Sequence, residues 1–195
     1  MTKQEFLQKF YASAVAATAG TGLFPETLLT QLIGESGYVL SNLATLYNNF
    51  FGIKADAAWN GRVVSKTTFE YYNGVKTPVA GNGKVYVDRT EALRDGANPV
   101  SLFRVYSSVT NGFKGWVDFL KDNPRYAKAG LFKATTPQAQ FEALKAAGYA
   151  TDPNYASYLT GIYNGLLSTI DTVKATIKNN SGTLAIALLV VGFFF

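Results

Sequence analysis

The spacing of apolar residues changes twice along this chain of 195 residues, and this change constrains its fold more than any other feature. Residues 2–19 and 26–35 carry apolar side chains at the 3.6-residue spacing of amphipathic helices. Residues 63–87 are instead rich in Val, Thr and aromatic side chains, and two Asn-Gly pairs mark hairpin turns within them. Helical patterns resume at about residue 111 and continue towards residue 178. We therefore expect an α+β fold, in which a small antiparallel meander is inserted between the helices of a mainly helical body.

The carboxylate of Glu35 stands out within the second helical segment. Glu35 follows Leu28 by seven residues and Leu32 by three, so the pattern places it on the apolar stripe that faces the core. It also lies in the last turn before Gly37, where the helix dipole disfavours an anion. Burial and dipole would both favour the protonated form, which a general acid needs near neutral pH. The alternative is a partly exposed Glu paired with a nearby Lys or Arg, and the pattern alone leaves both open.

Composition restricts the chemistry available to such a site. The chain has no His and no Cys, which excludes Ser-His-Asp and Cys-His catalysis, zinc sites built on imidazole or thiolate, and disulfide bonds. The remaining catalytic groups are carboxylates, Tyr, Lys, Ser and Thr, and pairs of carboxylates are the usual groups for hydrolysis of glycosidic bonds. We expect neither a cofactor nor a metal. The net charge of +5, without a Lys/Arg block, favours a cell wall or an anionic lipid as partner over a nucleic acid.

The last residues differ in character from the rest of the chain. Thr183–Phe195 contains no charged residue. We therefore expect a domain over residues 1–178 and, over residues 179–195, a short linker and a hydrophobic tail that associates with a membrane. Thirteen helical residues span about 20 Å, less than the roughly 30 Å of a hydrocarbon core, so a full span needs bilayer thinning, the preceding segment or partner helices in an oligomer or membrane protein. The alternative is a tail that docks on its own domain or on a neighbour.

Four motifs stand in order between Phe6 and about Leu167. They are the segment from Pro25 to Glu35-Ser36-Gly37; Ser41-Asn42-Leu43-Ala44 followed by Asn48-Asn49-Phe50-Phe51-Gly52-Ile53-Lys54; Phe103-Arg104-Val105-Tyr106; and Gly148-Tyr149-Ala150-Thr151-Asp152-Pro153-Asn154-Tyr155-Ala156. Between the second and the third lie Trp59, Gly61 and Thr67-Thr68-Phe69-Glu70. In order and spacing these motifs resemble the peptidoglycan hydrolases of glycoside hydrolase family 73, the endo-β-N-acetylglucosaminidase group.

The resemblance implies a lysozyme-like fold with a glycan cleft between the helical body and a β-lobe. It implies that Glu35 protonates the glycosidic oxygen, while Glu70 acts from the opposite side by activating water or stabilising positive charge on the sugar. Assistance by the substrate's own N-acetyl group stays open. Because the stretch after Glu70 is long for the family, Asp56, Asp88 and Glu91 are reserve candidates for the second carboxylate.

The expected substrate contacts come from the same motifs and are Ser36, Asn49, Phe51, Trp59 and Tyr149. The patterns around Phe51 and Trp59 fit core residues and sugar-stacking surface equally well. We expect the hydroxyl of Tyr149 at the cleft, within reach of the sugar or of the acid. Tyr155 is expected to be a core aromatic residue, and Asp152 to cap a helix.

The prediction that follows is a membrane-tethered enzyme that hydrolyses β-1,4 bonds of peptidoglycan as an endo-β-N-acetylglucosaminidase. A muramidase or a lytic transglycosylase could use the same acid. Outside enzymes, the alternative is a glycan-binding structural module of a membrane-bearing particle, and the presence of both Glu35 and Glu70 argues against it. No secretory signal is visible, so a virion-associated lytic enzyme on the membrane of a phage particle is a further expectation.

Overall fold

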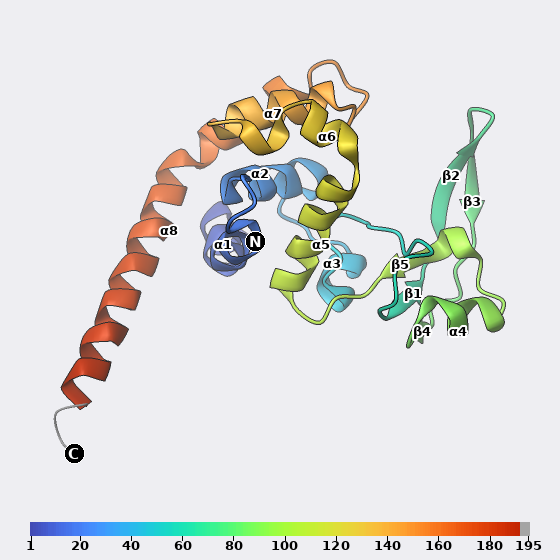
Figure 1. Cartoon of the computed structure of the whole chain (residues 1–195), viewed down its shortest axis with the longest axis horizontal. Coiled ribbons are helices and arrows are strands. Elements are labelled where there is room, and N and C mark those ends of the chain that lie inside the picture. Colours follow the sequence, from blue (N-terminus) through green and yellow to red (C-terminus); the bar gives the residue numbers. More distant parts are fainter. Residues whose placement is uncertain (192–195) are drawn as a thin grey trace.

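The computed structural model describes the backbone of residues 1–191 and the side chains of residues 1–179. Helices from both ends of the chain form a body, and a β-lobe from the middle of the chain extends from one side of it (Figure 1). The elements of the body are α1 (Lys3–Thr18), α2 (Pro25–Ser36), α3 (Asn42–Tyr47), α5 (Val109–Asp122), α6 (Pro124–Lys128), the 3-10 helix η2 (Leu131–Lys133), α7 (Pro137–Ala146) and α8 (Tyr155–Val191). Those of the β-lobe are β1 (Val63–Ser65), β2 (Thr68–Tyr72), β3 (Val75–Val79), β4 (Val85–Tyr86), α4 (Arg89–Arg94), η1 (Pro99–Ser101) and β5 (Leu102–Arg104).

Side-chain caps set the starts of several helices. Thr2 and Glu5 form a capping box ahead of α1, in which the Glu5 amide donates to Thr2 Oγ1 over 3.2 Å and the Thr2 amide donates to Glu5 Oε2 over 2.8 Å. Thr136 Oγ1 caps α7 by accepting a hydrogen bond from the amide of Ala139. Helix α8 begins only at Tyr155, because the chain first makes a turn in which Asp152 Oδ1 accepts from the amide of Asn154.

The core of the body lies between α1, α2, α5 and α8. Its fully buried side chains include Phe6, Leu7, Leu28, Leu32, Phe113 and Leu159. Burial of each Phe or Leu stabilises the fold by about 1.5–3 kcal/mol relative to an exposed side chain. Gly112 of α5 lies against the carbonyl oxygen of Asn48, where a Cβ atom would overlap that oxygen. This close approach holds the loop after α3 against the body, and that loop contributes to the site described below.

The β-lobe contains two small antiparallel sheets instead of the single meander that the sequence predicts. β1 lies between β4 and β5, while β2 and β3 form a separate hairpin. The predicted Asn-Gly turn at 73–74 joins β2 to β3, and both of its residues have positive φ. After β3, Gly81 lies directly against the backbone of Lys66, and the amide of Gly83 donates to the Ser65 carbonyl over 2.9 Å. The chain therefore crosses back over the end of β1, and β4 pairs with β1 and not with β3.

Helix α8 is longer than the sequence predicts. It continues from Tyr155 to Val191 without a break at residues 179–182, where the sequence predicts a linker. No Pro interrupts this stretch, and its single Gly costs a helix only about 1 kcal/mol. Beyond Val173 the described side chains of α8 are exposed, and the helix projects past the body (Figure 1).

The predicted membrane tail, Thr183–Phe195, lies outside the residues whose side chains the structure describes. In the part of the chain that is described, no helix combines the length and the hydropathy needed to cross a membrane.

Candidate active site

Glu35 is an exposed residue in the last turn of α2, and it does not face the core as its apolar stripe predicts. Residues from Glu26 to Ile33 are all buried, so α2 is covered on every side until that last turn. There Gly34 packs so closely on the Leu159 side chain of α8 that a Cβ atom would overlap it. Helix α8 therefore covers the side of the turn that carries Gly34, while Glu35 emerges from the core.

The hydroxyl of Tyr155 holds the carboxylate of Glu35. Tyr155 is the first residue of α8 and only 7% exposed, and it donates a hydrogen bond to Glu35 Oε1 over 3.2 Å. The buried side-chain amide of Gln31, one helical turn before Glu35, donates to the Tyr155 oxygen over 3.0 Å. Burial, and after it the negative charge of Glu35, raise the pKa of Tyr155. The hydroxyl therefore keeps its proton and remains a donor to the carboxylate.

The structure adds a contact with Glu35 to the core position predicted for Tyr155. The sequence predicts the Tyr149 hydroxyl at the cleft, within reach of the sugar or of the acid, and it predicts Tyr155 in the core. Tyr155 is buried as expected and also bonds to Glu35. Tyr149 is half-buried and stacks on Tyr155, with ring centroids 6.1 Å apart and an interplanar angle of 15°. Burial and the charge of Glu35 also raise the pKa of Tyr149, as expected for a side chain close to that carboxylate. Sequence reasoning missed Gln31, although its place four residues before Glu35 puts both on one helix face.

A groove of about 530 Å³ lies between the body and the β-lobe. Its lining includes Phe51, Trp116, Tyr126 and Tyr149, together with the charged side chains of Lys54, Asp56, Arg104 and Arg125. Phe51 stacks on Trp116, with ring centroids 5.3 Å apart and an interplanar angle of 26°. The structure thus places two predicted contacts, Phe51 and Tyr149, on one groove. Trp116 and Tyr126 are fully buried, so a ligand reaches the half-buried rings of Phe51 and Tyr149, and their faces beside charged groups suit a ligand with apolar and polar patches.

Asn49 and Ser36 use their side chains inside the protein, which differs from the substrate contacts predicted for them. Asn49 is 1% exposed, and its Oδ1 accepts from the Ile53 amide over 2.8 Å. Its Nδ2 donates to the carbonyl oxygens of Ile53 and Arg104 over 2.9 and 2.8 Å. Asn49 therefore ties its loop to β5 and has no group left for a ligand. The hydroxyl of Ser36 donates to the Leu32 carbonyl over 2.7 Å, within its own helix.

Trp59 belongs to a second pocket and not to the groove that contains Phe51. Its indole Nε1 donates to the Arg62 carbonyl over 3.0 Å, and the guanidinium of Arg104 lies 4.7 Å from its ring centroid. The second pocket has a volume of about 440 Å³ and is also lined by Tyr106 and Lys114. Arg104 lines both cavities and is the residue that they share.

Glu70 lies on β2 and forms an ion pair with Lys54 over 3.1 Å. Lys54 Nζ also donates to Thr68 Oγ1 over 3.2 Å and to the Val100 carbonyl over 2.6 Å, and it lies 4.1 Å from the Phe103 ring centroid. Since Lys54 lines the groove, this cluster places Glu70 near the groove's β-lobe side. Glu35 and Glu70 bond to different partners, and the hairpin that carries Glu70 stands apart from the helical body (Figure 1).

The three reserve carboxylates have partners of their own. Asp56 pairs with Arg104 over 2.8 Å and lines the groove. Asp88 caps α4 by accepting from the Glu91 amide, and Glu91 accepts from the Val87 amide, both over 2.8 Å. Asp88 and Glu91 thus support a helix start, which leaves Asp56 as the reserve candidate that lies on the groove.

Comparison with known proteins agrees with this geometry. Residues 11–167 match the glucosaminidase family model, described as mannosyl-glycoprotein endo-beta-N-acetylglucosaminidase. Peptidoglycan hydrolase FlgJ of Salmonella typhimurium is 34% identical over 93% of this chain and 52% of its own length. A probable N-acetylmuramidase of Lactococcus lactis subsp. lactis is 32% identical over 92% of this chain and 37% of its own length. The chain thus spans about half the length, or less, of these curated relatives.

Solved structures show the same architecture. The glycoside hydrolase domain of Salmonella typhimurium FlgJ matches 94% of this chain and 99% of its own, with a TM-score of 0.62 and 29% identity. The catalytic domain of the autolysin Auto from Listeria monocytogenes has a TM-score of 0.66 at 22% identity over 88% of each chain, and it supports the fold alone. The family model matches most of the length of this chain, and the chain has the lysozyme-like fold of helices with a small antiparallel sheet. This chain therefore belongs to the glucosaminidase family, glycoside hydrolase family 73.

Proposed function

We propose that this chain is a peptidoglycan hydrolase of the endo-β-N-acetylglucosaminidase type, which cleaves β-1,4 bonds of the wall glycan. The observation that carries the proposal is the carboxylate of Glu35, exposed at the end of a buried helix and held by Tyr155. Stacked on Tyr155 is Tyr149, which lines the groove between the lobes. The carboxylate is thus held next to a tyrosine pair that borders the groove, and the volume and aromatic lining of the groove suit sugar rings. Family membership and the FlgJ relatives support the same activity.

In this mechanism Glu35 is the general acid that protonates the leaving glycosidic oxygen. Its side chain has to keep one orientation while the substrate binds. The hydrogen bond from Tyr155 supplies this constraint, and Gln31 holds Tyr155 from the buried side. Because Tyr155 is buried at the start of α8, the orientation of the acid depends on the packing of α8 against α2.

Glu70 is the second carboxylate in this proposal, acting on the other face of the sugar ring. Its support is its place on the β-lobe and its ion pair with Lys54, a lining residue of the groove. If a water is the nucleophile, the two carboxyl groups need a separation of about 6.5–9.5 Å in the substrate complex, whereas direct attack needs about 5–5.5 Å. Asp56 on the groove, or the substrate's N-acetyl group, are the alternatives to Glu70.

Digestion of purified sacculi followed by mass spectrometry of the released muropeptides tests the proposal. We expect N-acetylglucosamine at the reducing ends. N-acetylmuramic acid ends would show a muramidase, the alternative favoured by the name of the Lactococcus lactis relative. Anhydro-sugars would show a lytic transglycosylase and remove the hydrolytic role of Glu70. Absence of any product between pH 4 and pH 8 would favour a glycan-binding structural module over an enzyme.

The membrane association predicted for Thr183–Phe195 is part of the proposal, and its support is the absence of charge in that segment. The end of α8 projects past the body (Figure 1), and the exposed Lys178 near it suits an anionic lipid surface. Flotation of the full chain with anionic vesicles is the test, and detection in purified phage particles tests a virion location. A chain that stays monomeric in lysate without detergent would overturn the membrane part and leave the enzyme proposal untouched.

A further inference from the structure

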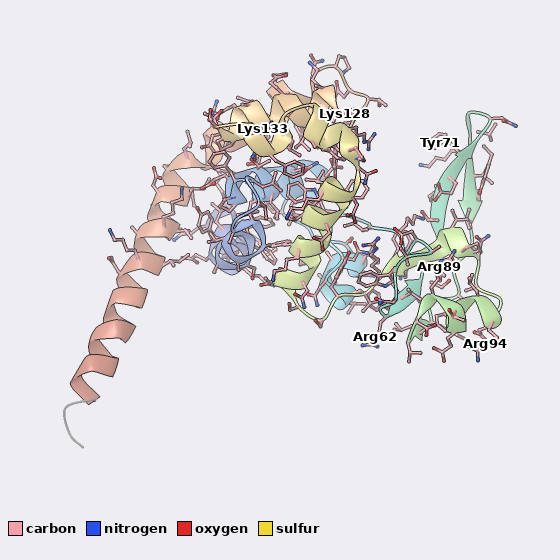
Figure 2. All side chains as sticks on the ribbon, viewed as in Figure 1. Arg62, Tyr71, Arg89, Arg94, Lys128 and Lys133 are labelled. Carbon is pink, nitrogen blue, oxygen red and sulfur yellow. The ribbon has the colours of Figure 1, made fainter. Side chains whose placement is uncertain are left out.

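The β2–β3 hairpin presents an exposed face that the proposed mechanism does not use. In the register of the hairpin Phe69 pairs with Pro78 and Tyr71 with Lys76, so these four side chains share one face. Glu70 lies between Phe69 and Tyr71 in the strand and points to the opposite face. Figure 2 shows Tyr71 on this hairpin, which projects beyond the other strands of the β-lobe. We call these four residues the Phe69–Tyr71 face.

The aromatic side chains of this face are unusually exposed to solvent. Phe69 is 55% exposed and Tyr71 is 69% exposed. Large aromatic rings next to each other on a surface indicate an interaction site more often than rings scattered singly. The Nζ of Lys76 lies 4.7 Å from the Phe69 ring centroid, so the face combines two aromatic rings with a cation and contains no carboxylate. None of its residues lines the groove.

The size of the face limits what can bind to it. Two strands of five residues cover about 17 Å by about 10 Å, or roughly 170 Å². A stable interface with a folded protein needs about 800 Å² on each partner, which is several times more. A narrow, ribbon-like polymer fits the dimensions better. Sugar rings present flat C–H surfaces that pack on the negative faces of aromatic rings, and Lys76 adds attraction for an acidic substituent.

We propose that the Phe69–Tyr71 face binds a peptidoglycan strand outside the groove, with its rings on the sugars and Lys76 on a carboxylate of the peptide stem. This inference rests on the proposed function for its choice of glycan. It gives the hairpin two roles on opposite faces: Glu70 towards the reaction, and the aromatic face towards the surrounding wall. Such a contact would keep the chain on an insoluble polymer between cleavage events by raising the effective concentration of its substrate.

Binding to insoluble sacculi measures this contact directly. The full chain carrying Glu35→Gln serves as the reference, because the wall must not be digested during co-sedimentation. Adding Phe69→Thr and Tyr71→Thr keeps residues that favour strands but removes both rings, and we expect the dissociation constant to rise about tenfold. Tyr71→Phe keeps the ring and should bind as the reference does. Lys76→Gln should weaken binding less and make it less sensitive to salt.

Val87→Thr is the matched control, because Val87 is 66% exposed on the β-lobe but lies outside the face. Its binding should equal that of the reference. Equal binding by the Phe69→Thr/Tyr71→Thr variant would overturn the inference, as would an equal loss in the Val87→Thr control. If unfolding temperatures show that the double variant is misfolded, binding of the Lys76→Glu variant to sacculi tests the inference in its place. Weaker binding than that of the reference supports the contact, and unchanged binding overturns it. Failure of the proposed activity is seen separately, as absence of muropeptides from the wild-type chain.

Discussion

Tyr155 and Glu35 are 120 residues apart in the chain, yet the tyrosine hydroxyl lies 3.2 Å from the Glu35 carboxylate and donates a hydrogen bond to it. The bond joins the start of α8 to the end of α2. The Glu35 carboxylate thus gains its orientation from a helix at the other end of the domain, so its position depends on packing far from the groove.

Glu35→Gln should lower the rate of sacculus digestion by roughly 10²–10⁴, because the amide keeps the shape of the side chain but cannot donate a proton to the leaving oxygen. Since Glu35 is exposed, neutralising it should change the free energy of unfolding by no more than about 0.5 kcal/mol. Muropeptide release and urea unfolding measure the two effects. An active Glu35→Gln chain would exclude Glu35 as the acid.

Tyr155→Phe should reduce kcat about tenfold while the Michaelis constant changes little, because the ring still packs but the acid loses its donor. The variant also leaves the buried amide of Gln31 without its acceptor, so we expect a loss of stability of about 1–2 kcal/mol. Tyr149→Phe is the matched comparison. It keeps the ring that stacks on Tyr155 and leaves the hydrogen bond between Tyr155 and Glu35 in place. Equal kcat values for the two variants would contradict a special role for Tyr155.

Glu70→Gln should lower kcat by roughly 10–10²-fold if this carboxylate activates water or stabilises the developing positive charge. Its ion pair with Lys54 is partly exposed, so the loss of stability should stay below about 1 kcal/mol. Asp56→Asn, tested in parallel, addresses the reserve candidate on the groove. Full activity in Glu70→Gln together with inactivity in Asp56→Asn would transfer the second role to Asp56.

Asn49→Ala should act on stability and not on substrate binding. The change leaves the Ile53 amide and the Arg104 carbonyl without this partner, while the Ile53 carbonyl still accepts from the Arg104 amide over 3.1 Å, so we expect a cost of roughly 2–3 kcal/mol. Thermal unfolding measures this loss. Asn111→Ala, at an exposed residue, should cost less than about 0.5 kcal/mol. A raised Michaelis constant for Asn49→Ala with an unchanged unfolding temperature would restore the predicted substrate contact.

Glu26 should make the stability of the chain depend on acid pH. Burial favours a higher pKa for Glu26, but hydrogen bonds from Lys174 and Tyr11 outweigh burial and hold its pKa below the ordinary value of 4.5. The unfolded chain therefore binds the proton more readily than the folded one. The stabilisation is present above about pH 4.5 and is lost as the pH falls through the lower pKa of the folded state.

Glu26→Gln removes this contribution and should cost about 1–2 kcal/mol at pH 7, because Lys174 remains half exposed and solvated. Urea unfolding at pH 7, 5, 4 and 3 should show the gap between the two chains narrowing as the pH falls. A gap that stays constant over this range would contradict the ion pair between α2 and α8.

Local signals in the sequence were sufficient for several elements of the fold. The helical spacing of residues 2–19 and the Asn-Gly turn at 73–74 act over a few residues, and the structure has a helix and a hairpin there. The order of four motifs was sufficient to indicate the family to which the chain belongs. The position of Glu35 at the end of α2 follows from the same local pattern.

Contacts between segments far apart in the sequence decided the exposure of Glu35, the strand pairing and the role of Asn49. Whether Glu35 faces the core depended on α8, which covers Gly34 and leaves Glu35 exposed. The pairing of β4 with β1 depended on the close approach of Gly81 to Lys66, and the role of Asn49 depended on β5. Helical period and turn propensity are set by neighbours within a few residues, so the sequence alone determined most of the helices and the turn between β2 and β3, and its motifs indicated the family. Exposure, strand order and hydrogen-bond partners depend on which surfaces meet after the chain collapses, and only the tertiary structure decided them.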